Sequence, residues 1–246
     1  FHLPTMPRWR WPLKRFGQKW VMWSMESDAY YPRQAHPFFR RLFDFRMTYH
    51  PDADVWLPYL QPDMPVLLRT PVKDKTADGL VAFFARNAAC RWDRTAYVAE
   101  LMRHVAVHAY GPCLRNRTIE NDRGCATKRE IISRYKFTVA FENAIGRDYV
   151  TEKIFDALIA GSVPLYVGAD NVDEFLPGDR CIINAADFAG PRELAEYLRR
   201  LDADDNEYAK YMQWRSEPIR PSFIAKCERL RERPLHNLCR LLGPSA

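Results

Sequence analysis

Short apolar runs alternate along the chain with polar stretches and with segments that contain Pro or Gly. Continuous apolar runs of about four to eight residues are typical of strands that are covered on both faces. On this pattern we expect strands at 19–24, 53–59, 80–84, 105–110, 136–141, 162–167 and 181–183. Apolar residues at helical spacing predict helices at 92–104, 151–160, 191–201 and 206–214.

The order of these elements, strand then helix then strand, is typical of βαβ units. Such units build a parallel sheet with helices on both of its faces, so the sequence predicts an α/β fold. The segment 60–79 contains Pro62, Pro65, Pro71 and Gly79, and we expect it to be a loop or linker.

The loop after the strand at 136–141 is the first place to look for a ligand. Ligands of open α/β sheets bind outside the carboxyl ends of the strands. This loop runs from Glu142 to Tyr149 and leads into a helix for which Thr151 fits the N-cap and Gly161 the stop.

Lys153 lies in the first turn of that helix, where its charge opposes the helix dipole. An anion in front of the helix would explain the position, because free N–H groups and a Lys together suit a pyrophosphate. The alternative is a solvent-facing lysine, and spacing alone does not choose between the two. The chain has neither a Walker motif nor a GxGxxG motif, so ATPase and dinucleotide-binding interpretations have no support.

The length of 246 residues allows one large domain or two small ones, and 47% hydrophobic residues are ample for a packed core. No apolar run of about 18 residues is present, so no membrane span is expected. The start at Phe1 shows no signal peptide, and we expect the chain to begin inside a longer precursor. A net charge of +6 favours anionic partners.

Basic and indole side chains mix near the start of the chain. Bases of a nucleic acid could stack on such a surface, whereas the simpler interpretation is a solvated face of the fold. The residues concerned are Arg8, Trp9, Arg10, Trp11, Lys14, Arg15, Lys19 and Trp20.

The six cysteines form no CxxC pair, which argues against a zinc ribbon or a thioredoxin motif. They fit either structural disulfides in an oxidising compartment or ordinary buried thiols. Asn116-Arg117-Thr118 is a glycosylation sequon, relevant only in a secreted chain.

Three segments in the second half resemble the signature of the α-1,3-fucosyltransferase family in both order and spacing. They are Tyr135–Asn143, Asp148–Lys153 and Gly161–Gly168. The similarity extends to Trp20–Ser27, Asn87–Leu101, Tyr110–Arg117 and Asp187–Trp214, and so covers most of the chain. Within the family, Tyr110–Arg117 and the Gly-Ser-Val-Pro stretch look most like the branches that fucosylate the N-glycan core or protein hydroxyls.

The resemblance implies a GT-B architecture of two facing Rossmann-like domains. We expect an N-terminal, acceptor-side domain at 1–108 and a C-terminal, GDP-fucose-binding domain at 109–246. Family members carry a further part of the N-terminal domain ahead of the position matching Phe1, so we expect that domain to be incomplete here.

The resemblance also implies roles for individual residues. Glu26 matches the acidic residue regarded as the general base of an inverting transfer. Arg94 and Lys153 match the basic residues that hold the diphosphate, and Asn143, Tyr149 and Glu152 match further donor-site positions. General base catalysis suits a partly buried carboxylate, and two cations can stabilise the leaving GDP without a metal. As simpler alternatives, Glu26 is a surface carboxylate after a strand and Arg94 a solvated helix charge.

Two short acidic patterns look like metal-binding DxD motifs, namely Asp52-Ala53-Asp54 and Asp202-Ala203-Asp204. GT-B enzymes generally do not hold an essential metal this way, and the second pattern fits a helix cap. We therefore expect no essential cofactor, with a divalent metal at most stimulatory.

The expected partners are GDP-fucose and a glycan or glycoprotein acceptor. We expect no nucleic acid, and membrane attachment only through a segment absent from this chain. The acceptor is left open between GlcNAc of a glycoprotein glycan and a protein Ser or Thr. Alternatives are a GT-B enzyme for another GDP- or UDP-sugar, and a non-catalytic glycan- or nucleic-acid-binding protein. The family implies the Golgi or ER lumen in a eukaryote and the cytoplasm in a bacterium.

Overall fold

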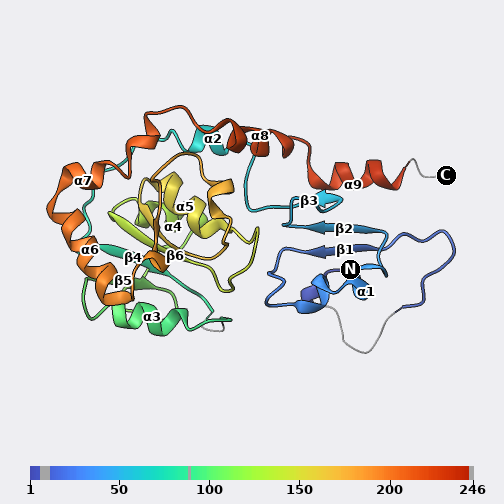
Figure 1. Cartoon of the computed structure of the whole chain (residues 1–246), viewed down its shortest axis with the longest axis horizontal. Coiled ribbons are helices and arrows are strands. Elements are labelled where there is room, and N and C mark those ends of the chain that lie inside the picture. Colours follow the sequence, from blue (N-terminus) through green and yellow to red (C-terminus); the bar gives the residue numbers. More distant parts are fainter. Residues whose placement is uncertain (6–11, 88–89, 244–246) are drawn as a thin grey trace.

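The computed structural model describes residues 1–5, 12–87 and 90–243. These residues form two parallel sheets, one of three strands in the order β1-β2-β3 and one of five in the order β5-β4-β6-β7-β8. Figure 1 shows the small sheet on one side of the molecule and the large sheet, surrounded by helices, on the other. The predicted α/β fold is confirmed.

Seven of the eight described strands overlap the predicted apolar runs, and β2 was not predicted. The small sheet contains β1 (Val21–Ser24), β2 (Phe45–Thr48) and β3 (Val55–Trp56). The large sheet contains β4 (Val81–Phe84), β5 (Val107–Tyr110), β6 (Phe137–Phe141), β7 (Val163–Val167) and β8 (Ile183–Asn184). All five residues of β6 are buried, as expected of a central strand covered on both faces.

The four predicted helices are present, and further helices lie where the sequence predicted none. The helices are α1 (Pro37–Arg40), α2 (Met64–Leu67), α3 (Arg94–Leu101), α4 (Cys125–Ile132), α5 (Glu152–Ala160), α6 (Pro191–Ala203), α7 (Asp205–Ala209), α8 (Pro221–Arg229) and α9 (Pro234–Leu242). The helix expected at 206–214 is instead the short α7, followed by a 3-10 turn at Gln213–Arg215. The expected linker 60–79 includes α2.

Two apolar cores hold the large sheet between its helices. On one face, Val98 of α3 and Leu194 of α6 pack with Phe83 of β4. On the other face, Ile154 of α5 packs with Tyr166 of β7, together with residues of the linker and of α8. The helix α5 is therefore fixed against the sheet, and its N-terminus lies at the carboxyl end of β6.

The predicted domain boundary at 108/109 falls inside β5. Strand β5 pairs with β4, and β4 pairs with β6, so these strands belong to one continuous sheet. We propose instead that the two parts divide within 57–80, the segment that joins the sheets. Helix α8 returns to the small sheet, where Arg229 donates to the carbonyl of Pro51 and lies 4.9 Å from the centre of the Trp56 ring.

Several expectations about the surface can be compared with the described residues. Lys14 and Lys19 pair with Asp44, and Lys14 lies over the Trp20 ring. Such contacts fit the interpretation of this stretch as a solvated face. Arg8 to Trp11 lie outside the described residues. All six cysteines are free thiols. Within the ranges that the structure describes, no helix has both the length and the apolar character needed to span a bilayer.

Gly161 ends α5 in a left-handed conformation, with φ of +70°. A Cβ atom there would lie 2.9 Å from Cγ2 of Val72. Because a non-glycine residue is strained in this region, Gly161→Ala should lower the free energy of unfolding by about 1–3 kcal/mol, measured by urea denaturation. Gly190→Ala is the control, since its backbone is extended and the space around its Cβ is open. Equal losses at both positions would contradict the prediction.

Candidate functional site

A cavity of about 470 Å³ opens at the carboxyl ends of β4, β5 and β6. Strand β4 leads to β5 on one side, while β6 lies on its other side, so the strand order reverses here. Crevices at such a reversal are the usual ligand sites of open α/β sheets. The wall includes Asn87 after β4, Gly111 after β5 and Asn143 after β6.

At the base of this wall, Lys153 pairs with the buried carboxylate of Glu142. The distance from Lys153 Nζ to Glu142 Oε2 is 2.9 Å, and Nζ also donates to Thr151 Oγ1 at 2.8 Å. Thr151 donates to Glu142 through both its backbone N–H and its hydroxyl, each at 2.7 Å. The turn between β6 and α5 is thus fixed by three groups that share one carboxylate.

Burial raises the pKa of Glu142, and the charge of Lys153 with the hydrogen bonds from Thr151 opposes that rise. Burial lowers the pKa of Lys153, but the charges of Glu142 and Glu152 and the hydrogen bond to Glu142 together outweigh it, so the pKa is raised overall. Lys153 is therefore a cation at neutral pH. Its side chain keeps 19% of its surface exposed, on the cavity side, whereas Glu142 has none.

Arg94 begins α3 and is almost fully buried beside the same cavity. Its Nη1 and Nη2 atoms donate to the carbonyls of Phe141 at 3.1 Å and Asn87 at 2.9 Å. Its Nε atom and the Oδ1 atom of Asn143 are buried and have no hydrogen-bond partner among the described residues. Buried polar atoms are normally paired, so these two atoms lack the partner that such atoms usually have.

Four cationic and three acidic side chains lie on the cavity wall. The cations are Arg86, Arg94, Lys128 and Lys153, and the acids are Asp122, Glu152 and Asp156. Asp156 is buried and already paired with Lys128 at 2.8 Å and Arg129 at 2.7 Å. The exposed balance of the wall suits an anionic ligand.

The structure brings together four of the six predicted site residues, namely Arg94, Asn143, Glu152 and Lys153. Tyr149 lies elsewhere: it is buried, with its ring 5.2 Å from that of Tyr49 and 6.2 Å from that of Tyr59. Glu26 follows β1 on the small sheet and is not part of the cavity wall. The roles assigned to these residues stay predictions.

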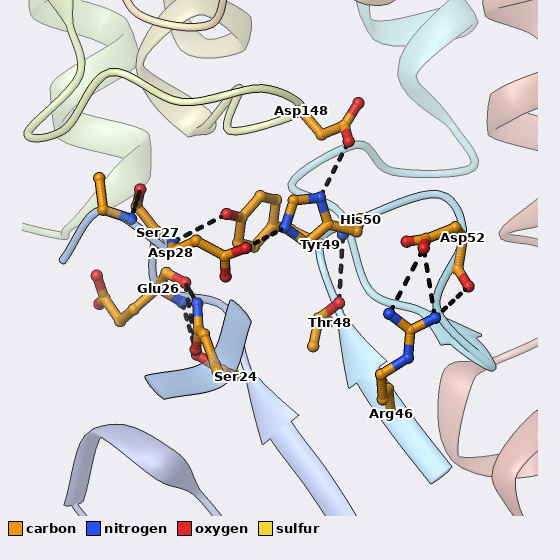
Figure 2. A network of polar contacts seen from close by, with 12 residues as sticks. Ser24, Glu26, Ser27, Asp28, Arg46, Thr48, Tyr49, His50, Asp52 and Asp148 are labelled. Atoms are coloured by element: carbon orange, nitrogen blue, oxygen red, sulfur yellow. Dashed lines mark hydrogen bonds and ion pairs between the residues drawn. The ribbon is translucent and has the colours of Figure 1, made fainter. Parts of the chain in front are cut away.

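Glu26 lies in a structured loop that faces the turn between β6 and α5 (Figure 2). Its backbone N–H donates to Ser24 Oγ at 3.2 Å, and its carbonyl accepts from Gln34 Nε2 at 2.5 Å. The hydroxyl of Tyr59 donates to the carbonyl of Met25 at 2.9 Å. Burial raises the pKa of Tyr59, and the charges of Glu152 and Glu26 add to the rise. The charge of the Glu26 carboxylate is therefore felt by Tyr59, whose ring contacts that of Tyr149.

Sequence reasoning gave no site role to Glu142, Lys128 or Asp156. The signal for Glu142 was visible, because a carboxylate directly after a fully apolar strand needs a partner. Lys128 and Asp156 carried no such signal, since their helices come together only in the folded chain. The two DxD patterns hold no metal cluster within the described ranges: Asp52 pairs with Arg46, and Asp204 caps α7 as expected.

Comparisons with known proteins agree with this geometry. The family model "Glycosyltransferase family 10 (fucosyltransferase) C-term" matches residues 72–244, and "Fucosyltransferase, N-terminal" matches residues 1–60. A solved structure of α1,3-fucosyltransferase with GDP-fucose has a TM-score of 0.64 and 21% identity, covering 94% of this chain and 77% of its own. That match supports the predicted two-sheet GT-B architecture.

Curated relatives include two kinds of fucosyltransferase. The 4-galactosyl-N-acetylglucosaminide 3-alpha-L-fucosyltransferase 9 of Rattus norvegicus is 33% identical over 81% of this chain and 54% of its own length. The GDP-fucose protein O-fucosyltransferase 3 of Homo sapiens is 42% identical over 50% of this chain and 27% of its own length. The chain therefore spans about half the length of the first of these relatives.

Replacing Lys153 with Met should lower the free energy of unfolding by about 3 kcal/mol near neutral pH, because the buried carboxylate of Glu142 loses its cation. The loss should shrink as the pH falls. Without Lys153 the pKa of Glu142 rises further, and protonation then removes the unpaired charge from the folded state. Urea denaturation from pH 8 to pH 5 measures the trend.

Lys210→Met is the matched control, since Lys210 pairs with Glu207 on the surface. Such a pair contributes at most about 1 kcal/mol, and its loss should show no comparable trend with pH. A cost at Lys153 that equals this control, or that stays constant with pH, would show that the Glu142 pair does not stabilise the turn.

Proposed function

The chain belongs to glycosyltransferase family 10, the fucosyltransferases, and from this premise we propose that it binds GDP-fucose in the cavity beside Lys153. The proposed reaction is an inverting transfer of L-fucose from GDP-β-L-fucose, in α-1,3 linkage, to GlcNAc of a glycoprotein glycan. The observation that carries the proposal is the convergence of Lys153, Arg94 and Asn143 on one cavity at the N-terminus of α5.

The diphosphate fits the wall in both charge and hydrogen bonding. The ammonium of Lys153 has three N–H donors, of which two serve Glu142 and Thr151. The third faces Glu152 at 3.4 Å, a weak contact that a phosphate oxygen can replace. The first turn of α5 adds backbone N–H groups and the positive end of the helix dipole. Arg94 supplies a second cation that its carbonyl partners hold in place.

These residues account for the proton that is removed and for the leaving group of the proposed reaction. A general base takes the proton from the acceptor hydroxyl as its oxygen attacks C1 of fucose, and the bond from C1 to the phosphate oxygen breaks on the opposite side. GDP leaves with the negative charge, which Lys153 and Arg94 stabilise. Glu26 is the proposed base, at the carboxyl end of β1. We propose that no metal is essential, although a divalent cation can stimulate the leaving of GDP.

Two acceptor classes remain in the proposal. The 33% identity over 81% of the chain with a 4-galactosyl-N-acetylglucosaminide 3-alpha-L-fucosyltransferase favours a GlcNAc acceptor. The 42% identity over half of the chain with a protein O-fucosyltransferase favours a Ser or Thr hydroxyl as the alternative. Either reaction fits a protein of the Golgi or ER lumen. A non-catalytic glycan-binding protein is the remaining alternative, and it leaves the cations of the cavity without a use.

The test is transfer of labelled fucose from GDP-fucose to a panel of acceptors. The panel contains an N-glycan core, a 4-galactosyl-N-acetylglucosaminide and a Ser/Thr-containing protein domain. Transfer to a GlcNAc acceptor supports the main proposal, and transfer to the protein alone supports the alternative. Binding of glycan without transfer, or preference for GDP-mannose or UDP-GlcNAc as donor, would contradict it.

Glu26→Gln should lower kcat by about 10²–10⁴-fold, because an amide cannot accept the proton of the acceptor hydroxyl. The affinity for GDP should be retained, since Glu26 lies outside the cavity wall. Transfer kinetics and calorimetric titration with GDP measure the two effects. Glu196→Gln, an exposed carboxylate on α6, is the control and should keep parental transfer. Parental kcat in Glu26→Gln would remove Glu26 from the mechanism.

Lys153→Met should weaken GDP binding by about tenfold to a hundredfold, the usual effect of losing a hydrogen bond to a charged group. Guanosine lacks the diphosphate and should bind parent and variant equally. Calorimetric titration with both ligands, below the unfolding temperature of the variant, separates the two outcomes. Equal losses for GDP and guanosine would mean that Lys153 shapes the cavity without contacting the diphosphate.

A further inference from the structure

His50 lies between two carboxylates that come from different halves of the molecule (Figure 2). Its Nε2 atom is 3.0 Å from Asp28 Oδ2, and its Nδ1 atom is 3.0 Å from Asp148 Oδ2. Asp28 follows β1 of the small sheet, and Asp148 lies in the turn between β6 and α5 of the large sheet. The imidazole therefore bridges the two loops through both of its nitrogens.

This geometry requires the protonated form of His50. A neutral imidazole has one N–H donor and one lone pair, and the lone pair would then face a carboxylate oxygen. Only the imidazolium donates to both neighbours. Burial lowers the pKa of His50, but the hydrogen bonds and charges of Asp28 and Asp148 outweigh it, so the pKa is raised overall. Burial raises the pKa of Asp28, but His50, Gln34 and Arg40 together outweigh it, so that pKa is lowered.

The surroundings of the bridge hold both carboxylates in place. Arg40 of the α1 segment lies 3.7 Å from Asp28, and the ring of Tyr49 lies 4.2 Å from the imidazole. Asn171 donates to Asp148 Oδ1 and accepts from its backbone N–H, each at 2.9 Å. Asp148 itself has φ of +64°, a conformation that these contacts stabilise.

The two bridged loops carry the groups of the proposed reaction. Glu26 lies two residues before Asp28, and Lys153 lies five residues after Asp148 in the turn that Glu142 fixes. We propose that His50 is a positioning residue: as an imidazolium bound to both carboxylates, it holds the loop of the base against the turn that binds the donor. This inference rests on the proposed function, because positioning has meaning only if Glu26 and the donor react together.

The direction of the pH dependence follows from the raised pKa. A histidine with a raised pKa in the folded state stabilises its contacts fully below its unfolded pKa of about 6.5, and the stabilisation is lost as the pH rises through the folded pKa. Deprotonation leaves a lone pair facing one carboxylate, and the loops separate. We expect kcat to fall on the alkaline side, with a much smaller change in the affinity for GDP.

Asp148→Asn is the sharpest test, because Asn tolerates the left-handed backbone and keeps the side-chain shape. Its amide can donate to the unprotonated Nδ1 of His50, while the Nε2–H group donates to Asp28. The neutral imidazole is then fully paired, so the alkaline loss of kcat should disappear. His50→Gln can reach only one carboxylate, and kcat should fall about tenfold to a hundredfold with no alkaline limb.

Two measurements test whether His50 positions the two loops. The first is kcat and KM from pH 6 to 9, and the second is histidine titration by NMR. Both are made on the parent, Asp148→Asn and His50→Gln. The imidazole signal missing in His50→Gln identifies His50, which should titrate above about 6.5 in the parent and lower in Asp148→Asn. The same alkaline limb in parent and Asp148→Asn, or parental kcat in His50→Gln, would overturn the positioning role alone. Absence of transfer to every acceptor would overturn the proposed function, while the titration still reports the bridge.

Discussion

The ion pair between Glu142 and Lys153 is the interaction on which the site depends. A carboxylate without solvent exposure ends the central strand of the large sheet, and burial of such a charge is costly unless it is paired and hydrogen-bonded. Lys153 and Thr151 provide that pairing. Because both belong to the start of α5, the pairing also sets where the helix begins and which way its first turn faces. A requirement of the fold thus places a cation on the wall of a cavity.

The same turn is also where the two sheets meet. Tyr149 packs against Tyr49 and Tyr59, and Asp148 reaches His50. Between its first and last residues the turn therefore contacts β6, α5 and the segments that follow β2 and β3. A segment that makes contacts on so many sides can adopt few alternative conformations. Its precision comes from burial and pairing on both sides and does not depend on regular secondary structure.

The sequence predicted most of what local pattern determines. The central strands are continuous apolar runs, and α5 and α6 have strong helical spacing, so their positions were confirmed. β2 was missed because Arg46 interrupts it, so that Phe45–Thr48 is not a continuous apolar run. α4 was missed because its apolar residues stand in pairs at its two ends, with the polar run Thr127–Glu130 between them, and show no helical spacing. Family resemblance supplied the site residues, and four of the six lie on one cavity.

What the sequence could not provide were contacts between distant segments. Arg94 looked like one solvated charge among several, yet its carbonyl partners Asn87 and Phe141 bury it. The bridge from Asp28 through His50 to Asp148 joins residues about a hundred positions apart, and no local sequence pattern predicts it. The sheet that β4 and β5 join was equally hidden, because strand pairing, not position along the chain, decides it.

The return of α8 and α9 to the small sheet has a consequence for biosynthesis. Arg229 covers Trp56, and α9 packs beside β3, although these segments are separated by the entire large sheet in the chain (Figure 1). Vectorial folding, in which early domains form as units while later ones are still being translated, is therefore incomplete for this molecule. The small sheet is translated before α8 and α9, so Trp56 and β3 gain these contacts only after the large sheet has been synthesised.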